Sequence, residues 1–102
     1  MGEVHVSAQD EEVRAGPGDD IVVRLPENAT TGYRWHVESL DGGLEVVADD
    51  YAPPGEILPG AGGTRVLRLR PAEAGEARLE LVLQQPWGDD VADRYALRVT
   101  VE

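Results

Sequence analysis

The stretch Ala77-Arg78-Leu79-Glu80-Leu81-Val82-Leu83-Gln84 carries the clearest folding signal of this chain. A large or small apolar residue falls at every second position. Successive side chains of a β-strand point to opposite faces, so this period of two predicts a half-buried strand. Six further runs show a similar alternation, weakest in the fourth of the seven, and they cover residues 4–7, 21–25, 33–38, 44–51, 66–70 and 95–102.

Glycine and proline punctuate these runs. The segment 71–75 is too short for a helix, and its proline and glycine predict a turn. Short alternating strands separated by turns are typical of a β-sandwich. We therefore predict an all-β fold, namely a single immunoglobulin-like antiparallel β-sandwich of about seven strands that forms one domain over residues 1–102. Without Phe or Cys, Trp35 and a ladder of leucines are expected to fill the core.

The composition excludes several classes of function. The absence of cysteine excludes disulfides, thiolate metal sites and a cysteine nucleophile. A formal net charge of −11, with every basic residue an arginine, repels nucleic acid and anionic membranes. No apolar run approaches the roughly 20 residues of a membrane span, and the first residues lack a signal-peptide pattern. We expect no nucleic acid and no membrane as partners, and the charge leaves a basic or neutral protein partner open. A cytoplasmic location is favoured, and a secreted or periplasmic one stays open.

The most informative segment for function is Asn28-Ala29-Thr30-Thr31-Gly32-Tyr33-Arg34-Trp35. It begins as a tight turn, because Asn side chains close turns onto the backbone and Gly accepts a positive φ. Tyr33 and Trp35 then lie two apart and point to the same face of a strand. A shaped loop on a rigid strand is a common design for recognition sites. An ordinary β-turn gives the same local pattern.

Strand parity groups this segment with two others. If seven strands alternate in direction, the connections near 26–32, 52–63 and 85–93 emerge at one end of the sandwich. The connections near 8–20, 40–43 and 71–76 then lie at the other end. Long connections are more often functional than short ones. The first end is therefore the candidate site, and it also carries the runs Gly60-Ala61-Gly62-Gly63 and Gln85-Pro86-Trp87.

In this order the three motifs resemble those of chagasin-type inhibitors of papain-like cysteine peptidases. That family presents Asn-Pro-Thr-Thr-Gly-aromatic, Gly-x-Gly-Gly and Arg-Pro-Trp or Arg-Pro-Phe on three loops of an immunoglobulin-like sandwich. The resemblance extends from about Ile21 to Val101. It implies a monomer, not an enzyme, that uses no cofactor or metal and blocks the cleft of a papain-like cysteine peptidase reversibly, noncovalently and competitively. The implied protease-binding residues are Asn28, Ala29, Thr30, Thr31, Gly32, Tyr33, Gly60, Ala61, Gly62, Gly63, Gln85, Pro86 and Trp87.

Within this set the resemblance gives the central role to Thr30 and Thr31. Threonine is stiff at χ1 and offers both a hydroxyl and a methyl group. The glycines of the second motif let the backbone approach a partner closely. Trp87 supplies an aromatic anchor of the kind found at binding hot spots. Two positions depart from the family pattern: Ala29 replaces a proline, which leaves the free loop less restricted, and Gln85 replaces an arginine, which removes a charge-assisted contact.

Metal binding is an alternative that the residues alone leave open. His5 and His36 occupy outward strand positions, which are more typical of solvated histidines than of a metal pair. Hard cations prefer several carboxylate oxygens, and three acidic pairs sit in or beside predicted loops. These pairs lack a recognised ligand spacing, and they are Asp19-Asp20, Asp49-Asp50 and Asp89-Asp90.

Two further alternatives concern the kind of function. A β-sandwich module that binds a non-protease protein would use the same three loops. An enzyme would need a nucleophile with a base in reach, and Ser7 or Ser39 with His36 is the available combination. No nucleophile-elbow motif accompanies either serine.

Overall fold

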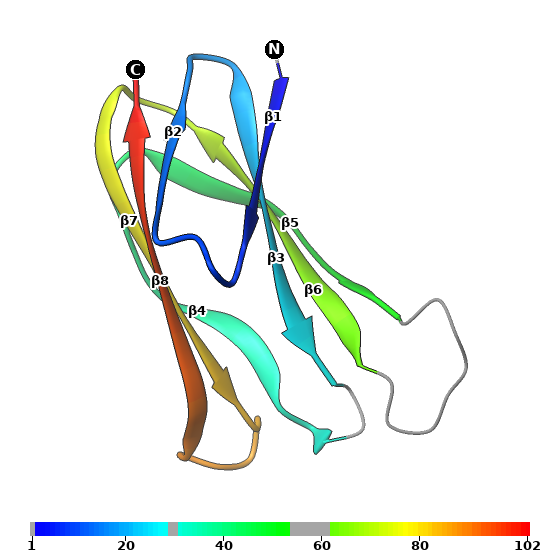
Figure 1. The fold of residues 1–102 in the computed structure, drawn as a ribbon. Coiled ribbons are helices and arrows are strands. Elements are labelled where there is room, and N and C mark those ends of the chain that lie inside the picture. Colours follow the sequence, from blue (N-terminus) through cyan, green and yellow to red (C-terminus); the bar gives the residue numbers. More distant parts are fainter. Residues whose placement is uncertain (1, 29–30, 54–61) are drawn as a thin grey trace.

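The computed structural model describes residues 2–28, 31–53 and 62–102. These form eight β-strands in two four-stranded sheets, which confirms the all-β sandwich (Figure 1). The first sheet has the order β1-β3-β6-β5, and its strands are β1 Gly2–Ser7, β3 Asp19–Glu27, β6 Gly63–Pro71 and β5 Leu44–Ala52. The second has the order β2-β8-β7-β4, and its strands are β2 Glu12–Ala15, β8 Val91–Val101, β7 Gly75–Gln84 and β4 Arg34–Asp41. The described residues contain no helix that is long and apolar enough to cross a membrane.

The stretch 8–20 differs from the prediction because it contains an additional strand. The short β2 pairs in parallel with β8, from Glu12 opposite Arg98 to Ala15 opposite Val101. Consequently β1 and β3 run in the same direction and pair in parallel, whereas alternation without β2 required them to be antiparallel. The turns before and after β2 lie at its opposite ends, so this stretch is not one connection at the far end of the sandwich. The remaining pairings are antiparallel.

The core follows the predicted alternation. The inward side chains of both sheets meet in one cluster, in which Trp35 is 5% exposed. Full burial of an aliphatic side chain contributes roughly 1.5–3 kcal/mol, so this ladder is the main source of stability. Val22 and Val82 are buried as well, although they alternate with the core positions, and both lie on inner strands of their sheets. The inward residues that are at most 1% exposed are Ile21, Val23, Leu25, Leu67, Leu69, Leu79, Leu81, Leu97 and Val99.

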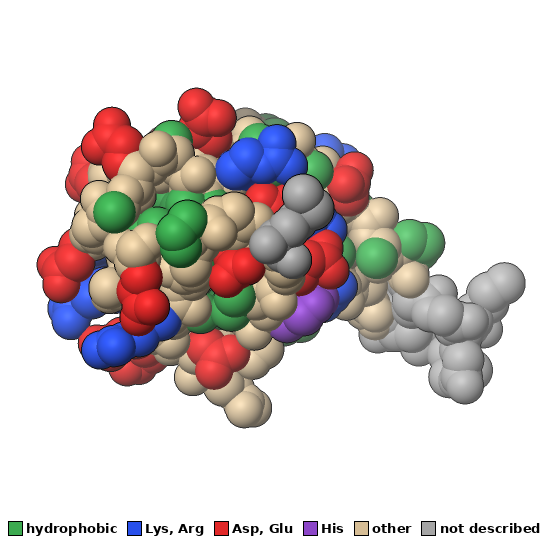
Figure 2. Space-filling model, turned by 90° about the horizontal axis from the view of Figure 1, so that it is seen from above, with side chains coloured by type: hydrophobic (Ala, Val, Ile, Leu, Met, Phe, Trp, Pro, Cys, Tyr) green, Lys and Arg blue, Asp and Glu red, His purple; other side chains and the backbone are tan. Residues whose placement is uncertain are grey.

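Three connections leave the sandwich at one end, as strand parity predicted. In Figure 1, β3, β5 and β7 run toward the lower end, and β4, β6 and β8 run back from it. We call these connections the first loop (residues 28–33), the second loop (53–62) and the third loop (85–90). The start of β1 and the end of β8 lie at the opposite end of the sandwich (Figure 1). Seen from that opposite end, acidic side chains and arginines are interspersed around the rim (Figure 2).

Candidate functional site

The three loops carry the predicted site residues, and most of these residues are described. The described ones are Asn28, Thr31, Gly32, Tyr33, Gly62, Gly63, Gln85, Pro86 and Trp87. The predicted residues Ala29, Thr30, Gly60 and Ala61 lie outside the described residues. The geometry of the site is therefore defined by both ends of the first loop, the last residue of the second loop and the whole third loop.

The first loop is closed by hydrogen bonds of Thr31. Its backbone N–H donates to the Asn28 carbonyl oxygen at 3.2 Å, and its hydroxyl donates to the same oxygen at 2.8 Å. The hydroxyl oxygen in turn accepts the Tyr33 N–H at 3.3 Å. Gly32 has φ +79°, a conformation that side chains rarely adopt. The hydroxyl of Thr31 thus shapes the turn, while the residue itself stays exposed.

The first and third loops are in direct contact. The Trp87 ring lies over Gly32 so closely that a Cβ added at Gly32 would come within 2.6 Å of the ring atom Cη2. The Gln85 side-chain amide donates to the Thr31 carbonyl oxygen at 3.2 Å. Trp87 is nevertheless 74% exposed. The two loops therefore form one continuous surface, with a large aromatic group at its outer side.

The base of the second loop is fixed by internal packing. Gly63 is buried at the start of β6, and a Cβ there would collide with the Tyr51 hydroxyl and lie 2.5 Å from the Ala52 carbonyl oxygen. The prediction assigned the missing side chain of Gly63 to close approach by a partner, but the neighbouring β5 already requires it. Gly62 is exposed, and a Cβ at this position would lie 3.9 Å from the Asn28 Cβ. The end of the second loop is thus beside the first loop.

A buried ion pair lies beneath the loops, and sequence reasoning missed it. Glu27 is 3% exposed, and its Oε2 accepts a hydrogen bond from Arg65 Nη2 at 2.6 Å. The hydrogen bonding of the Arg65 guanidinium to the Glu27 carboxylate is the main cause that raises the pKa of Arg65 above its ordinary value. Both residues occupy inward positions, since Glu27 continues the alternation through Leu25 and Arg65 continues that through Leu67. The available signal was a charged residue at an inward position of each of two paired strands, where the register places Glu27 and Arg65 as diagonal neighbours.

The residues that suggested metal binding do not converge. His5 and His36 are both exposed and belong to different sheets. Asp20 bonds to Arg68 and Arg70, and Asp49 bonds to Arg65. Across the described ranges, no three His, Asp or Glu side chains are grouped so that they could hold a metal ion.

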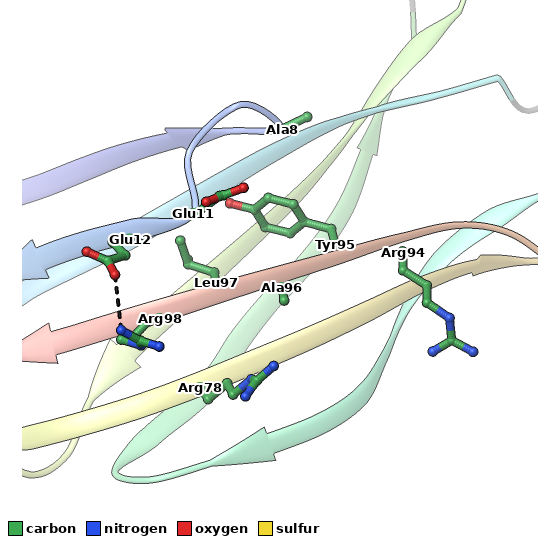
Figure 3. A pocket seen from close by; sticks show the side chains of 9 residues that line it. All are labelled: Ala8, Glu11, Glu12, Arg78, Arg94, Tyr95, Ala96, Leu97 and Arg98. Atoms are coloured by element: carbon green, nitrogen blue, oxygen red, sulfur yellow. Dashed lines mark hydrogen bonds and ion pairs between the residues drawn. The ribbon is translucent and has the colours of Figure 1, made fainter.

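A hollow of about 380 Å³ on the second sheet lies elsewhere (Figure 3). Its lining comes from the turn before β2 and from β2, β7 and β8. Each of its arginines already pairs with a carboxylate of the chain: Arg78 with Glu80 at 3.0 Å, Arg94 with Glu38 at 3.3 Å and Arg98 with Glu12 at 3.1 Å. The hollow therefore offers no unpaired arginine to an anionic ligand, and the loops remain the candidate site.

Comparison with known proteins finds peptidase inhibitors both by sequence and by structure. Residues 14–101 match the family described as Chagasin family peptidase inhibitor I42. The chain is similar to Amoebiasin-1 of Entamoeba histolytica, with 35% identity over 83% of this chain and 84% of that protein. It is also similar to Chagasin of Trypanosoma cruzi, with 33% identity over 69% of this chain and 68% of that protein. The fold is that of the cysteine protease inhibitor EhICP2 from Entamoeba histolytica, with a TM-score of 0.86 and 18% identity over 100% of this chain and 97% of that one.

Proposed function

Because the chain belongs to the chagasin family of peptidase inhibitors, we propose that it inhibits papain-like cysteine peptidases reversibly, noncovalently and competitively. The three loops at one end of the sandwich occlude the active-site cleft. The partner is the peptidase, and the chain itself carries out no catalysis.

The contact between the first and third loops is the observation that carries this proposal. Trp87 packs over Gly32, and Gln85 bonds to the Thr31 carbonyl oxygen at 3.2 Å. A binding surface that is assembled before the encounter loses less conformational entropy on association. A wedge made of two loops that support each other suits a narrow cleft better than two independent loops.

The exposed residues of these loops suit the proposed roles. Trp87 is 74% exposed and offers the large aromatic area typical of binding hot spots. Thr31 uses its hydroxyl hydrogen within the turn, so in this proposal its methyl group and the turn it shapes face the partner. Gly62 is exposed beside the first loop and leaves its backbone accessible to an extended segment.

Titration of papain with the wild-type chain tests the proposal. We expect competitive, reversible loss of activity, with an inhibition constant that rises about 30-fold in Trp87→Ala, since truncation of a hot-spot aromatic costs about 2 kcal/mol or more. Thr31→Ala is expected to weaken inhibition too, because it removes the hydroxyl that closes the turn.

Val47→Ala is the matched control, because Val47 is a large exposed apolar residue on β5 outside the loops. Its inhibition constant should equal that of the wild type. If the wild-type chain fails to inhibit papain and several related peptidases at micromolar concentration, the proposed function is wrong, and the loops then serve a different protein partner.

A further inference from the structure

The buried carboxylate of Glu27 lies at the point where the first loop begins. Glu27 is the last residue of β3, and it is the one charged residue in the described part of the chain that is buried. Trp35 is the second residue of β4, just beyond the end of the same loop. Because β3 and β4 belong to different sheets, no ladder of backbone hydrogen bonds joins the two ends of the loop.

Glu27 supplies the missing connection. Its Oε1 accepts the backbone N–H of Trp35 at 2.6 Å, which spans the first loop from one sheet to the other. The indole N–H of Trp35 donates to the Pro26 carbonyl oxygen at 2.9 Å, so the same two strand ends are joined twice. The first loop therefore emerges from two strand ends whose separation is fixed by side chains.

Arg65 holds the Glu27 carboxylate in this orientation. Its Nε donates to Oε1 at 3.2 Å and its Nη2 donates to Oε2 at 2.6 Å, which is the bidentate arrangement of a guanidinium on a carboxylate. The guanidinium also donates to Asp49 at 3.0 Å and lies 5.7 Å from the centre of the Tyr51 ring. Asp49 and Tyr51 are on β5, close to where the second loop begins, so Arg65 joins the supports of both loops.

Stability alone is a poor explanation for this ion pair. Buried ion pairs are often replaced by well-packed apolar residues without loss of stability, because desolvation of the charges offsets their attraction. What apolar residues at these positions would not provide is the directed acceptor for the Trp35 N–H. The chemistry of the pair fits a requirement for defined geometry at the base of the loop.

We propose that Glu27 and Arg65 are positioning residues of the inhibitory surface, which hold the first loop in its binding conformation without touching the peptidase. This inference rests on the proposed function. It assigns a functional role to two residues that lie outside the three loops and below them.

The matched pair Arg65→Gln and Arg68→Gln tests the inference. Both arginines lie on β6, and each bonds to two carboxylates, Arg65 to Glu27 and Asp49, and Arg68 to Glu3 and Asp20. We expect Arg65→Gln to raise the inhibition constant for papain at least tenfold, because fewer molecules have the competent loop, while Arg68→Gln stays within about twofold. The inference would be overturned if both variants raised the inhibition constant equally at a temperature where both are folded.

Glu27→Gln and Glu27→Leu separate positioning from packing. The glutamine retains an oxygen that can accept the Trp35 N–H, whereas the leucine has no acceptor. We expect Glu27→Gln to keep most of the inhibition and Glu27→Leu to lose it, even where their melting temperatures are similar. Inhibition that follows the melting temperature across all four variants would show a merely structural role.

Hydrogen exchange of the free chain gives a readout that does not depend on inhibition. Arg65→Gln should speed exchange at the amides of Tyr33 and Trp35, and Arg68→Gln should leave both unchanged. If the wild type does not inhibit papain, the proposed function fails while this measurement still decides the positioning role. Unchanged exchange at both amides in Arg65→Gln would refute that role.

Discussion

At the scale of single residues, Gln85 shows how a departure from a family motif acquires its own role. The sequence suggested that Gln85 loses a charge-assisted contact with a partner. In the folded chain its amide instead donates to the Thr31 carbonyl oxygen at 3.2 Å. A neutral hydrogen bond contributes about 0.5–1.5 kcal/mol. It acts before the partner arrives, because it joins the first loop to the third.

We expect Gln85→Ala to raise the inhibition constant for papain about fivefold, the equivalent of about 1 kcal/mol. Gln85→Glu should raise the inhibition constant further, because its carboxylate cannot donate to the Thr31 carbonyl oxygen and is repelled by it. Inhibition kinetics measure both effects, and Gln9→Ala, at an exposed turn outside the three loops, is the control. A Gln85→Glu variant that inhibits as well as the wild type would contradict a donor role.

The individual residues of the site were predictable to different degrees. The turn at Gly32 was predictable, since Asn, Thr and Gly determine its backbone locally. The collision that excludes a side chain at Gly63 was not, because Tyr51 comes from another strand. Glu27 and Arg65 were missed because a charged residue at an inward position contradicts the apolar pattern until its partner is known.

At the scale of elements, β1 is held to its sheet by charges as well as by backbone pairing. Arg68 on β6 bonds to Glu3 on β1 and to Asp20 on β3, and Arg70 bonds to Asp20 at 3.2 Å. Hydrogen bonds from the arginines lower the pKa of both carboxyl groups: chiefly from Arg68 for Glu3, and from Arg70 and then Arg68 for Asp20. The network therefore crosses three neighbouring strands.

This network makes the stability of the chain sensitive to acid. A carboxyl group whose pKa is lower in the native state stabilises the fold fully above its unfolded pKa, and that contribution disappears as the pH falls through the native value. For Asp20 the loss begins near its ordinary value of 3.8 and continues at lower pH. We expect Asp20→Asn to be less stable than the wild type at neutral pH, with a difference that shrinks at about pH 2.5.

Urea unfolding at a series of pH values measures this difference, and Asp41→Asn is the control because Asp41 is an exposed aspartate at the end of β4. The role of the carboxylate would be refuted if the free energies of unfolding of Asp20→Asn and the wild type differed by the same amount down to the lowest pH.

The elements themselves were largely predictable, apart from β2. Six of the seven runs with a period of two became strands that present an apolar face to the other sheet. In the weaker fourth run, which became β5, only Leu44 is buried, and this strand pairs with β6. The sequence of β2, Glu12-Val13-Arg14-Ala15, alternates but has only two apolar positions, which is too short a run to predict a strand. Its pairing with β8 is a contact between distant parts of the chain, which local patterns do not reveal. The position of the three loops was still predicted correctly. The additional strand β2 comes before β3, and from β3 onward the strands alternate in direction as expected.

At the scale of the whole molecule, the net charge of −11 affects how the chain meets its partner. Acidic side chains and arginines are interspersed on the end opposite the loops (Figure 2), and Asp89 and Asp90 lie within the third loop itself. Long-range attraction raises the association rate with an oppositely charged protein, and salt screens it.

We expect the association rate constant with a positively charged papain-like peptidase to fall as salt is raised from about 10 mM to about 150 mM, because the Debye length shortens from about 30 Å to about 8 Å. The dissociation rate constant should change much less. Stopped-flow measurement at several salt concentrations separates the two, and an association rate constant that does not respond to salt would show that the charge plays no part in the encounter.

The two tryptophans of the chain occupy opposite environments, and this gives the molecule two optical reporters. Trp87 is 74% exposed in the third loop, while Trp35 is 5% exposed beneath the first. A small water-soluble quencher reaches the indole of Trp87 in the free chain, and bound peptidase would shield that indole from it. The emission of Trp35 shifts to longer wavelength only when the sandwich opens to water. Fluorescence of the unlabelled chain thus distinguishes an occupied surface from a damaged fold in one cuvette.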